Sequence, residues 1–304
     1  MGQACEGRVV IVTGSGRGIG RAHALEFARQ GASVVVNDLG AEVDGSGSGT
    51  GPAGEVVEEI RAMGGKAVAN GEDVSDWEGA QKLVNTAIES FGKLDVVVNN
   101  AGILRDRMII NMTDAEWDAV IRVHLRSTFA MTRWAATYWR EQTKAGIEVD
   151  ARVINTASSS GIYGNVGQAN YGAAKAGIAS FTIIASQELA RYGATVNAIA
   201  PVALTRMTEN LGIFSHEEDP AKFDPFAPEN VSPLVVWLGS AASKGITGRV
   251  FDVYGGHIDV AEGWHAGPGA DIQDRWKVED LDKVIPSLVA KAKKNADTMG
   301  NIPE

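Results

Sequence analysis

Short apolar runs alternate along the chain with longer segments of mixed polarity. The runs predict strands at Val9–Val12, Ser33–Asn37, Lys66–Asn70, Leu94–Asn99, Arg152–Ala157, Thr195–Ile199 and Arg249–Val253. The segments between them predict helices at Gly54–Met63, Asp76–Phe91, Asp114–Gln142, Tyr171–Tyr192 and Glu229–Leu238. Unbroken apolar runs such as Val96–Val98 are typical of parallel strands that are covered on both faces. The pattern therefore predicts an α/β protein with a doubly wound parallel sheet, whose ligand crevice lies at the carboxyl ends of the strands.

No linker divides this pattern, so we expect a single domain over residues 1–264 and a C-terminal extension over residues 265–304. In the extension, Val278–Lys293 is helical in pattern, and we expect that helix to pack on the surface. Two stretches interrupt the alternation. The glycine-rich residues 45–51 indicate a loop, either plainly flexible or covering one end of a ligand. Residues 203–228 indicate a substrate loop, and such a long segment beside a site is often a lid.

The first strand runs directly into a glycine-rich turn, Thr13-Gly-Ser-Gly-Arg-Gly-Ile-Gly20, which opens the next helix. Strand, glycine-rich turn and helix form the context that a dinucleotide site needs, because the glycines let the backbone approach a pyrophosphate at the helix N-terminus. The second strand ends in Asp38, eighteen residues beyond Gly20. An acidic residue at about this distance is placed to accept hydrogen bonds from the adenosine ribose. The turn and Asp38 together predict a Rossmann-like nucleotide site.

A second candidate site lies near the middle of the chain. Tyr171 and Lys175 stand at i and i+4 and therefore on one face of a helix, and Ser158 lies thirteen residues upstream of Tyr171. An ammonium can stabilise a phenolate and lower the pKa of the phenol from its ordinary value of about 10. A tyrosine tuned in this way can exchange a proton with an alcohol or a carbonyl oxygen. A nearby serine hydroxyl can hold that oxygen.

Composition narrows the range of partners. The net charge of -10 argues against nucleic acid, whose phosphates require a basic surface. The N-terminus has no basic stretch followed by an apolar one, and no apolar run approaches the roughly 20 residues that span a bilayer, so we expect neither a secretory signal nor a membrane partner. The single cysteine, Cys5, rules out an intrachain disulfide and suits a reducing compartment. We expect a cytoplasmic protein with no metal site.

Three motifs in chain order resemble the short-chain dehydrogenase/reductase family. They are the glycine-rich turn, Asn99-Asn100-Ala101-Gly102, and Ser158 with Tyr171-x3-Lys175, and the likeness spans roughly residues 8–257. Within the family, several strings resemble the (3R)-hydroxyacyl-CoA dehydrogenase unit of the peroxisomal D-bifunctional enzyme. These strings include residues 34–40, 64–70, 99–107, 123–126, 160–165 and 168–171.

The resemblance implies particular roles. Tyr171 would be the acid/base, Ser158 would bind the substrate oxygen, and Lys175 would hold the nicotinamide ribose and lower the pKa of Tyr171. The cofactor would be NAD, held by the residues Gly14, Arg17, Gly18, Ile19, Gly20, Asp38, Asp73, Val74, Asn100, Ala101, Gly102, Tyr171, Lys175 and Pro201. Arg17 suits the 2′-phosphate of NADP, but the carboxylate of Asp38 would repel it, so we expect NAD. Family likeness also implies a homodimer or homotetramer, paired through Asp114–Gln142 and Tyr171–Tyr192.

The chain also departs from the family pattern. His124 occupies the usual position of an asparagine that supports a proton relay, and it is either a substitute for that residue or a packed core histidine. Val202 follows Pro201 where glycine is usual, and Arg206 replaces a usual threonine, which puts the nicotinamide carboxamide contacts in doubt. We expect an NAD-dependent dehydrogenase that acts on a 3-hydroxyacyl-CoA, and two alternatives stay open. One is a hydroxysteroid dehydrogenase or 3-ketoacyl reductase, and the other is a non-catalytic NAD-sensing protein.

Overall fold

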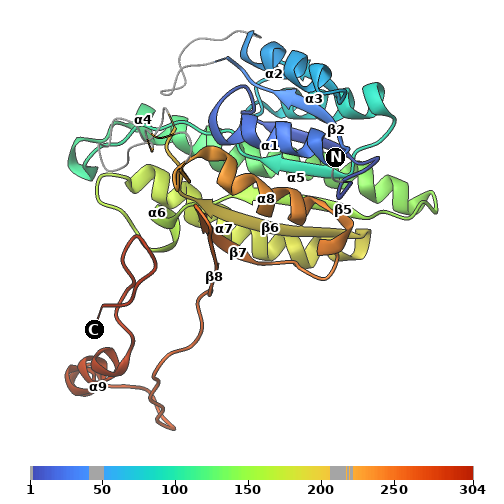
Figure 1. Cartoon of the computed structure of the whole chain (residues 1–304). Helices are drawn as coiled ribbons and strands as arrows, with labels where there is room; N and C mark the ends of the chain where they lie inside the picture. Colours follow the sequence, from blue (N-terminus) through green and yellow to red (C-terminus); the bar gives the residue numbers. More distant parts are fainter. Residues whose placement is uncertain (1–2, 41–50, 206–216, 218, 220–221, 304) are drawn as a thin grey trace.

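One eight-stranded sheet forms the centre of the protein (Figure 1). This computed structural model describes residues 3–40, 51–205, 217, 219 and 222–303. The strands lie in the order β3-β2-β1-β4-β5-β6-β7-β8. Their bounds are β1 Val9–Thr13, β2 Ser33–Asn37, β3 Lys66–Asn70, β4 Val96–Asn99, β5 Ala151–Thr156, β6 Ala194–Pro201, β7 Val250–Tyr254 and β8 His257–Ala261. The order reverses beside β1, as the doubly wound prediction requires, so that prediction is confirmed.

Strand β8 was not predicted, and it adds one antiparallel edge strand to the otherwise parallel sheet. It pairs antiparallel with β7, with Tyr254 opposite His257. The connection between them is only Gly255 and Gly256, and Gly255 has a positive φ of +50°. A two-residue turn of this kind can join only antiparallel neighbours, because a parallel crossover needs a dozen or more residues.

Helices cover both faces of the sheet. The α-helices are α1 Gly18–Arg29, α2 Gly51–Ala62, α3 Trp77–Phe91, α4 Asp114–Ile121, α5 Ser127–Lys144, α6 Ser159–Ile162, α7 Ala169–Leu189, α8 Ser232–Gly239 and α9 Val278–Lys291. Short 3-10 turns are η1 Ile109–Asn111, η3 Ala190–Tyr192, η5 Pro228–Val231 and η6 Ala241–Ser243, and η2 Arg122–Arg126 is a π-helical turn. One apolar core joins α1, α2 and α8 to the sheet, and a second joins α3, α5 and α7 to the opposite face.

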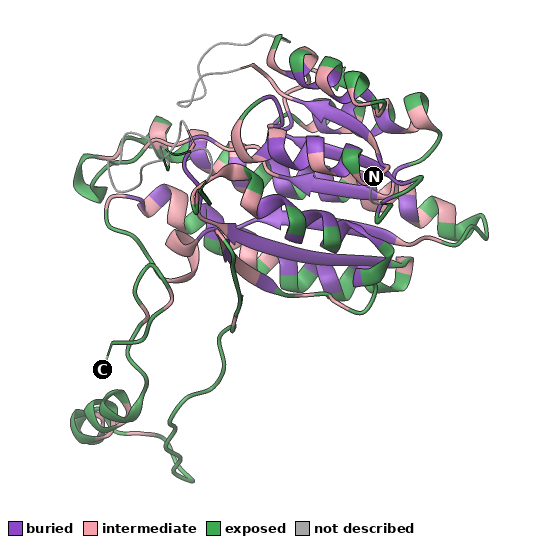
Figure 2. Cartoon of the chain, viewed as in Figure 1, coloured by how far each residue is buried: buried purple, intermediate pink, exposed green. Residues whose placement is uncertain are grey.

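The unbroken apolar runs follow from these two cores. Val10 and Val12 of β1 belong to the first core, whereas Val9 and Ile11 belong to the second. Successive side chains of a strand point to opposite faces, so a strand covered on both faces needs apolar residues at every position. Figure 2 shows the central strands buried along most of their length.

The long helix expected over Asp114–Gln142 is divided into α4, the π turn η2 and α5. A capping box begins α4, since the side chain of Thr113 accepts from the backbone of Glu116 and the side chain of Glu116 accepts in return. Apolar periodicity alone cannot show a π turn, because the extra residue shifts the pattern only locally.

Such π turns are frequent at functional sites, and η2 holds the buried His124.

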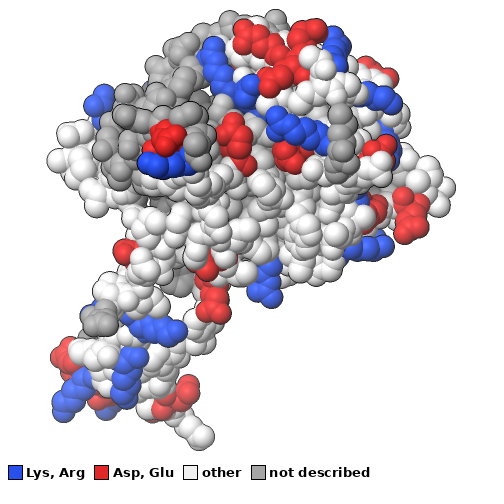
Figure 3. Space-filling view, viewed as in Figure 1, with Lys and Arg blue, Asp and Glu red and all other residues white. Residues whose placement is uncertain are grey.

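The C-terminal arm (residues 265–303) extends away from the sheet and carries α9 (Figure 1). No residue of α9 is buried, and Val278 and Val289 are 77% and 67% exposed. The expectation that this helix packs on the surface of its own chain is therefore wrong. The arm carries charges of both signs (Figure 3). Beyond α9 the chain returns to the body, where Thr298 and Met299 line a small hollow with Tyr163.

Candidate active site

The glycine-rich turn lies at the carboxyl end of β1 and begins α1. Gly14 and Gly18 have positive φ angles of +61° and +53°, which favour glycine. A side chain on Gly14 would bring its Cβ to 2.8 Å from the Cα of Ala101, and one on Gly20 would lie 2.2 Å from the carbonyl oxygen of Gly14. Arg17 is the N-cap of α1 but makes no side-chain capping bond. The turn therefore places backbone without side chains at a helix N-terminus. This is the arrangement that binds a pyrophosphate.

Asp38 lies directly beside this turn. One of its carboxylate oxygens accepts from the backbone N–H of Gly16 at 2.8 Å, and the other accepts from Gly40 at 2.7 Å. A carboxylate oxygen can accept further hydrogen bonds. The two backbone bonds thus fix the carboxylate without exhausting it, as a group that binds ribose hydroxyls would require.

Thr13 and Asn100 tie the turn to the end of β4. The hydroxyl of Thr13 accepts from the backbone N–H groups of Asn100 and Ala101, and the side chain of Asn100 donates to the carbonyls of Thr13 and Gly14. The sequence assigned Asn100 and Ala101 to the cofactor, but it gave no role to the Thr13 side chain. The signal that could have indicated this role is the position of Thr13, a hydroxyl residue at the end of an otherwise apolar strand.

Asp73 and Val74 follow β3, which pairs with β2, the strand that precedes Asp38. The carboxylate of Asp73 accepts from the backbone and hydroxyl of Ser75 and pairs with Arg122 at 3.3 Å, while Val74 is buried. Their contact with adenine stays a prediction. Ile19 packs against the core from the start of α1, and Pro201 ends β6.

The structure brings Ser158, Tyr171 and Lys175, which we call the trio, to the carboxyl end of β5. Ser158 follows this strand and caps α6, and the other two lie one turn apart in α7. The Ser158 side chain lies close enough to Tyr171 to act on the pKa of its phenol. The Lys175 Nζ lies 5.4 Å from the centroid of the Tyr171 ring and donates to the carbonyl oxygen of Thr156 at 2.6 Å.

The ionisation of the trio differs from the expectation that Lys175 lowers the pKa of Tyr171. Burial raises the pKa of Tyr171 to about 12, even though the neighbouring Ser158 side chain acts in the opposite direction. Burial also lowers the pKa of Lys175 to about 7. Both shifts have one cause, since removal from water disfavours the charged form of each group. The chain alone therefore holds Tyr171 as a neutral phenol, which is the form that donates a proton.

His124 packs edge-on against the ring of Tyr171, with ring centroids 5.2 Å apart. Its Nε2 lies 2.7 Å from the carbonyl oxygen of Ile103 and 3.1 Å from the Ile103 backbone nitrogen. Its Nδ1 is buried and has no hydrogen-bond partner among the described residues. Burial lowers the pKa of His124 to about 3, so the ring is neutral near pH 7. A Cβ on Gly102 would lie 2.4 Å from this ring, which explains the glycine there.

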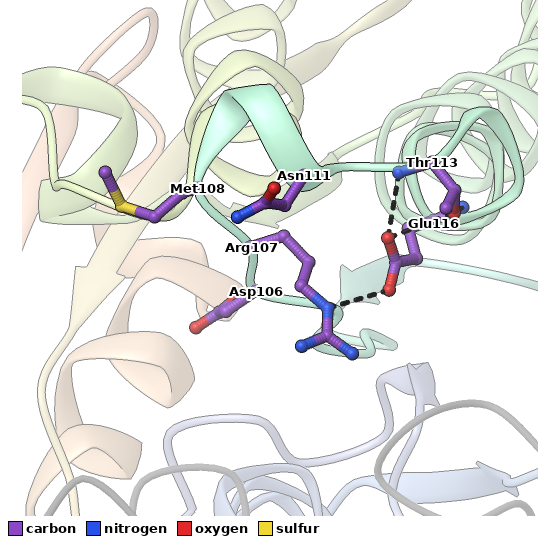
Figure 4. A pocket seen from close by; sticks show the side chains of 6 residues that line it. All are labelled: Asp106, Arg107, Met108, Asn111, Thr113 and Glu116. Carbon is purple, nitrogen blue, oxygen red and sulfur yellow. Dashed lines mark hydrogen bonds and ion pairs between the residues drawn. The ribbon is translucent and has the colours of Figure 1, made fainter.

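An open hollow of about 540 Å³ lies at Asp106, the residue whose charge acts on the phenol of Tyr171. It is lined by Asp106, Arg107, Met108, Asn111, Thr113 and Glu116 (Figure 4). Arg107 donates to the carboxylate of Glu116 at 3.1 Å on one side, while Asp106 extends on the other. Of the expected substrate loop, Arg206 and most residues to 221 lie outside the described residues, as do residues 45–50 of the glycine-rich loop.

Among the described residues, no cluster of histidine, cysteine and acidic residues could hold a metal ion. None of the helices in this part of the chain is long and apolar enough to cross a membrane.

Comparison with known proteins identifies the class. Residues 8–214 match the short chain dehydrogenase family. The chain therefore belongs to the short-chain dehydrogenase/reductase family and is an oxidoreductase that acts on CH–OH groups with a nicotinamide cofactor.

Individual relatives are similar over most of this chain. Hydroxyacyl-CoA dehydrogenase ChsB1 of Mycobacterium tuberculosis is 46% identical over 265 residues, which are 85% of this chain and 81% of that protein. Peroxisomal multifunctional enzyme type 2 of Mus musculus is 46% identical over 270 residues, 89% of this chain but only 34% of the mouse protein. The crystal structure of a short chain dehydrogenase from Mycobacterium avium has a TM-score of 0.87 and 57% identity, and the match covers 96% of this chain and 98% of that one.

Proposed function

We propose that the protein is an NAD-dependent dehydrogenase that interconverts a 3-hydroxyacyl-CoA and a 3-ketoacyl-CoA. The observation that carries the proposal is the meeting of two sites at one edge of the sheet. Ser158 acts on the phenol of Tyr171 there, and the glycine-rich turn with Asp38 lies at the carboxyl ends of strands in the same sheet.

The roles of the trio follow from its contacts. The Ser158 hydroxyl orients the substrate oxygen, and the Tyr171 oxygen takes the proton of the alcohol or returns it to the ketone. When bound, the nicotinamide supplies the hydride acceptor or donor. Oxidation needs the phenolate form of Tyr171, and positive charge on Lys175, one turn away, favours that form. The Lys175 ammonium is fixed for this role by the carbonyl oxygen of Thr156.

The preference for NAD rests on Asp38. A 2′-phosphate beside its carboxylate would place two anions together, and unit charges about 4 Å apart repel by roughly 4 kcal/mol at an effective dielectric of about 20. Arg17 is exposed, and a flexible exposed cation gains only about 1 kcal/mol. The carboxylate therefore outweighs the arginine.

The substrate class rests on the hollow and on the relatives. The hollow has the volume of an ordinary ligand pocket. Met108 and its neighbours Ile109 and Ile110 are exposed beside it and offer apolar contacts to an acyl chain. The name of the M. tuberculosis relative, a hydroxyacyl-CoA dehydrogenase, supports an acyl-CoA substrate.

An assay at 340 nm with a panel of 3-hydroxyacyl-CoAs of different chain length, hydroxysteroids and 3-ketoacyl-CoAs tests this function. We expect the hydroxyacyl-CoAs to give the highest kcat/KM with NAD. A clear preference for free hydroxysteroids would contradict the proposed acyl-CoA substrate but would agree with the proposed interconversion of alcohol and ketone. Tight NAD binding without turnover of any alcohol or ketone would favour a sensing role instead.

We also propose that the protein forms a homodimer or homotetramer. Phe129 of α5 and Ile183 and Ile184 of α7 are all at least 40% exposed. Apolar groups gathered on two neighbouring helices favour association with a second copy. Light scattering after size exclusion would give the mass, and a monomer would contradict the proposal. A cytoplasmic location remains the expectation from the sequence.

A further inference from the structure

The side chain of Gln168 lies between two segments that are far apart in the sequence. Its Oε1 accepts from the hydroxyl of Ser160 at 2.7 Å and from the side chain of Asn165 at 3.0 Å. Its Nε2 donates to a carboxylate oxygen of Asp106 at 2.7 Å. Gln168 itself is only 8% exposed, and its donor and acceptor bonds together fix the amide in one orientation.

Each end of this chain of hydrogen bonds leads to the trio. Ser158 caps α6, and its Oγ accepts from the backbone N–H of Ser160 at 3.2 Å. Through Ser160, Gln168 therefore holds the first turn of the helix that Ser158 begins. Gln168 is also the N-cap residue of α7, and its carbonyl oxygen accepts from Gly172, the residue after Tyr171.

The contact on the other side anchors the amide to the substrate hollow. Asp106 lines that hollow, and its charge acts on the phenol of Tyr171 in the direction of a higher pKa. The backbone nearby is fixed as well, because the Arg107 N–H donates to Gly167 and the Asn170 side chain donates to the Arg105 carbonyl. Asp106 is thus a firm acceptor for Gln168.

We propose that Gln168 is a positioning residue for the reaction, which holds Ser158 of the β5–α6 junction and Tyr171 of α7 in register by linking Ser160 to Asp106. Only one polarity of the amide satisfies this arrangement. Ser160 and Asn165 need an acceptor, whereas the Asp106 carboxylate needs a donor. A glutamate at position 168 would accept from Ser160 but would place two carboxylates in contact.

The arrangement of donor and acceptor in the Gln168 amide allows a test of this positioning role. Gln168→Glu should lower kcat by at least about 10-fold, because a carboxylate cannot donate to Asp106. In the double variant Asp106→Asn/Gln168→Glu, the asparagine amide donates to the new carboxylate, so the bond is restored with donor and acceptor exchanged. We expect its kcat to return to within about 3-fold of Asp106→Asn alone, a coupling that only a direct contact produces.

Three measurements separate positioning from a general loss of structure. The KM for NAD should stay unchanged, since Gln168 lies away from the glycine-rich turn. The melting temperatures of Gln168→Glu and the double variant should agree within a few degrees. Gln273→Glu makes the same chemical change at an exposed position of the C-terminal arm and should keep full kcat.

The inference rests on the proposed roles of Ser158 and Tyr171, so Tyr171→Phe is measured in parallel. High activity in Tyr171→Phe would overturn those roles. An inactive Tyr171→Phe beside a Gln168→Glu with unchanged kcat would overturn the positioning role alone. A double variant as slow as the product of the two single effects would overturn it too.

Discussion

The two halves of the site lie at one edge of the sheet, but they are built from different materials. The proposed cofactor half is mostly backbone: glycines without a Cβ, the N-terminus of α1, and Asp38 fixed by two backbone bonds. The catalytic half is built from side chains that are removed from water, and their ionisation has shifted toward the neutral forms. The geometry of the first half therefore depends on steric space, whereas the ionisation of the second half depends on electrostatics.

The largest effect should come from the catalytic half. Tyr171→Phe removes only the oxygen that carries the proton, so we expect kcat to fall by about 10²- to 10⁴-fold. NAD should bind as before, because the ring and its packing against His124 remain. Steady-state kinetics and fluorescence titration of NAD measure the two effects.

Tyr192→Phe is a matched control, since it deletes the same atom in the 3-10 turn η3 beyond the C-terminal end of α7. Equal losses in the two variants would show that the hydroxyl of Tyr171 has no special role.

Lys175→Ala should weaken both the rate and the binding of NAD. The Nζ bond to Thr156 is lost together with the positive charge near Tyr171. The pH profile checks the charge. The pKa of Lys175 is lowered to about 7, so in the free enzyme its cation is present below that pH and is lost as the pH rises through it. If Lys175→Ala changed neither the KM for NAD nor the pH profile of kcat/KM, this assignment would be wrong.

In the cofactor half, NAD binding should instead be sensitive to added side-chain volume. Gly20→Ala places a Cβ 2.2 Å from the Gly14 carbonyl oxygen, so the turn must move and NAD binding should weaken. The backbone shift should also destabilise the fold by about 1–3 kcal/mol. Calorimetric titration of NAD and urea unfolding measure both quantities.

Gly54→Ala provides the control, because a Cβ at this position of α2 meets nothing within 4 Å. That change should stabilise the helix by about 0.5–1 kcal/mol. Similar NAD affinities in the two glycine variants would contradict a sterically defined turn.

The same comparison explains what the sequence could predict. The glycine-rich turn and Asp38 are local features, and their spacing carries the geometry of the backbone. Gln168 and Asp106 are sixty-two residues apart, and nothing in either segment indicates that they share a hydrogen bond. The pKa of Tyr171 is a similar case, because the i, i+4 spacing shows the lysine but not the burial that opposes it. The π turn η2 and strand β8 were also missed, since one extra residue and one glycine pair leave little trace in an apolar pattern.

Cofactor choice should give an intermediate effect. We expect kcat/KM with NAD to exceed that with NADP by at least about 10-fold, for which about 1.4 kcal/mol is enough. Asp38→Ala should narrow or invert this ratio, because it removes the charge that repels a 2′-phosphate. Both ratios come from initial rates with each cofactor at a fixed alcohol concentration. Comparable efficiencies in the unmodified protein would contradict the argument from Asp38.

The smallest effect is expected at His124, where packing and proton relay make different predictions. If the ring relays protons, His124→Asn should retain much of the activity, because an amide also donates and accepts. His124→Ala should lose more, since it also leaves a cavity beside Gly102 and the Tyr171 ring. The pKa of His124 is lowered to about 3, so the ring stays neutral from pH 5 to pH 9 and His124→Asn should leave the pH profile unshifted. Kinetics over this range and melting curves test both points. Equal kcat in the asparagine and alanine variants would instead support a packing role alone, with the alanine variant differing only in its lower melting temperature.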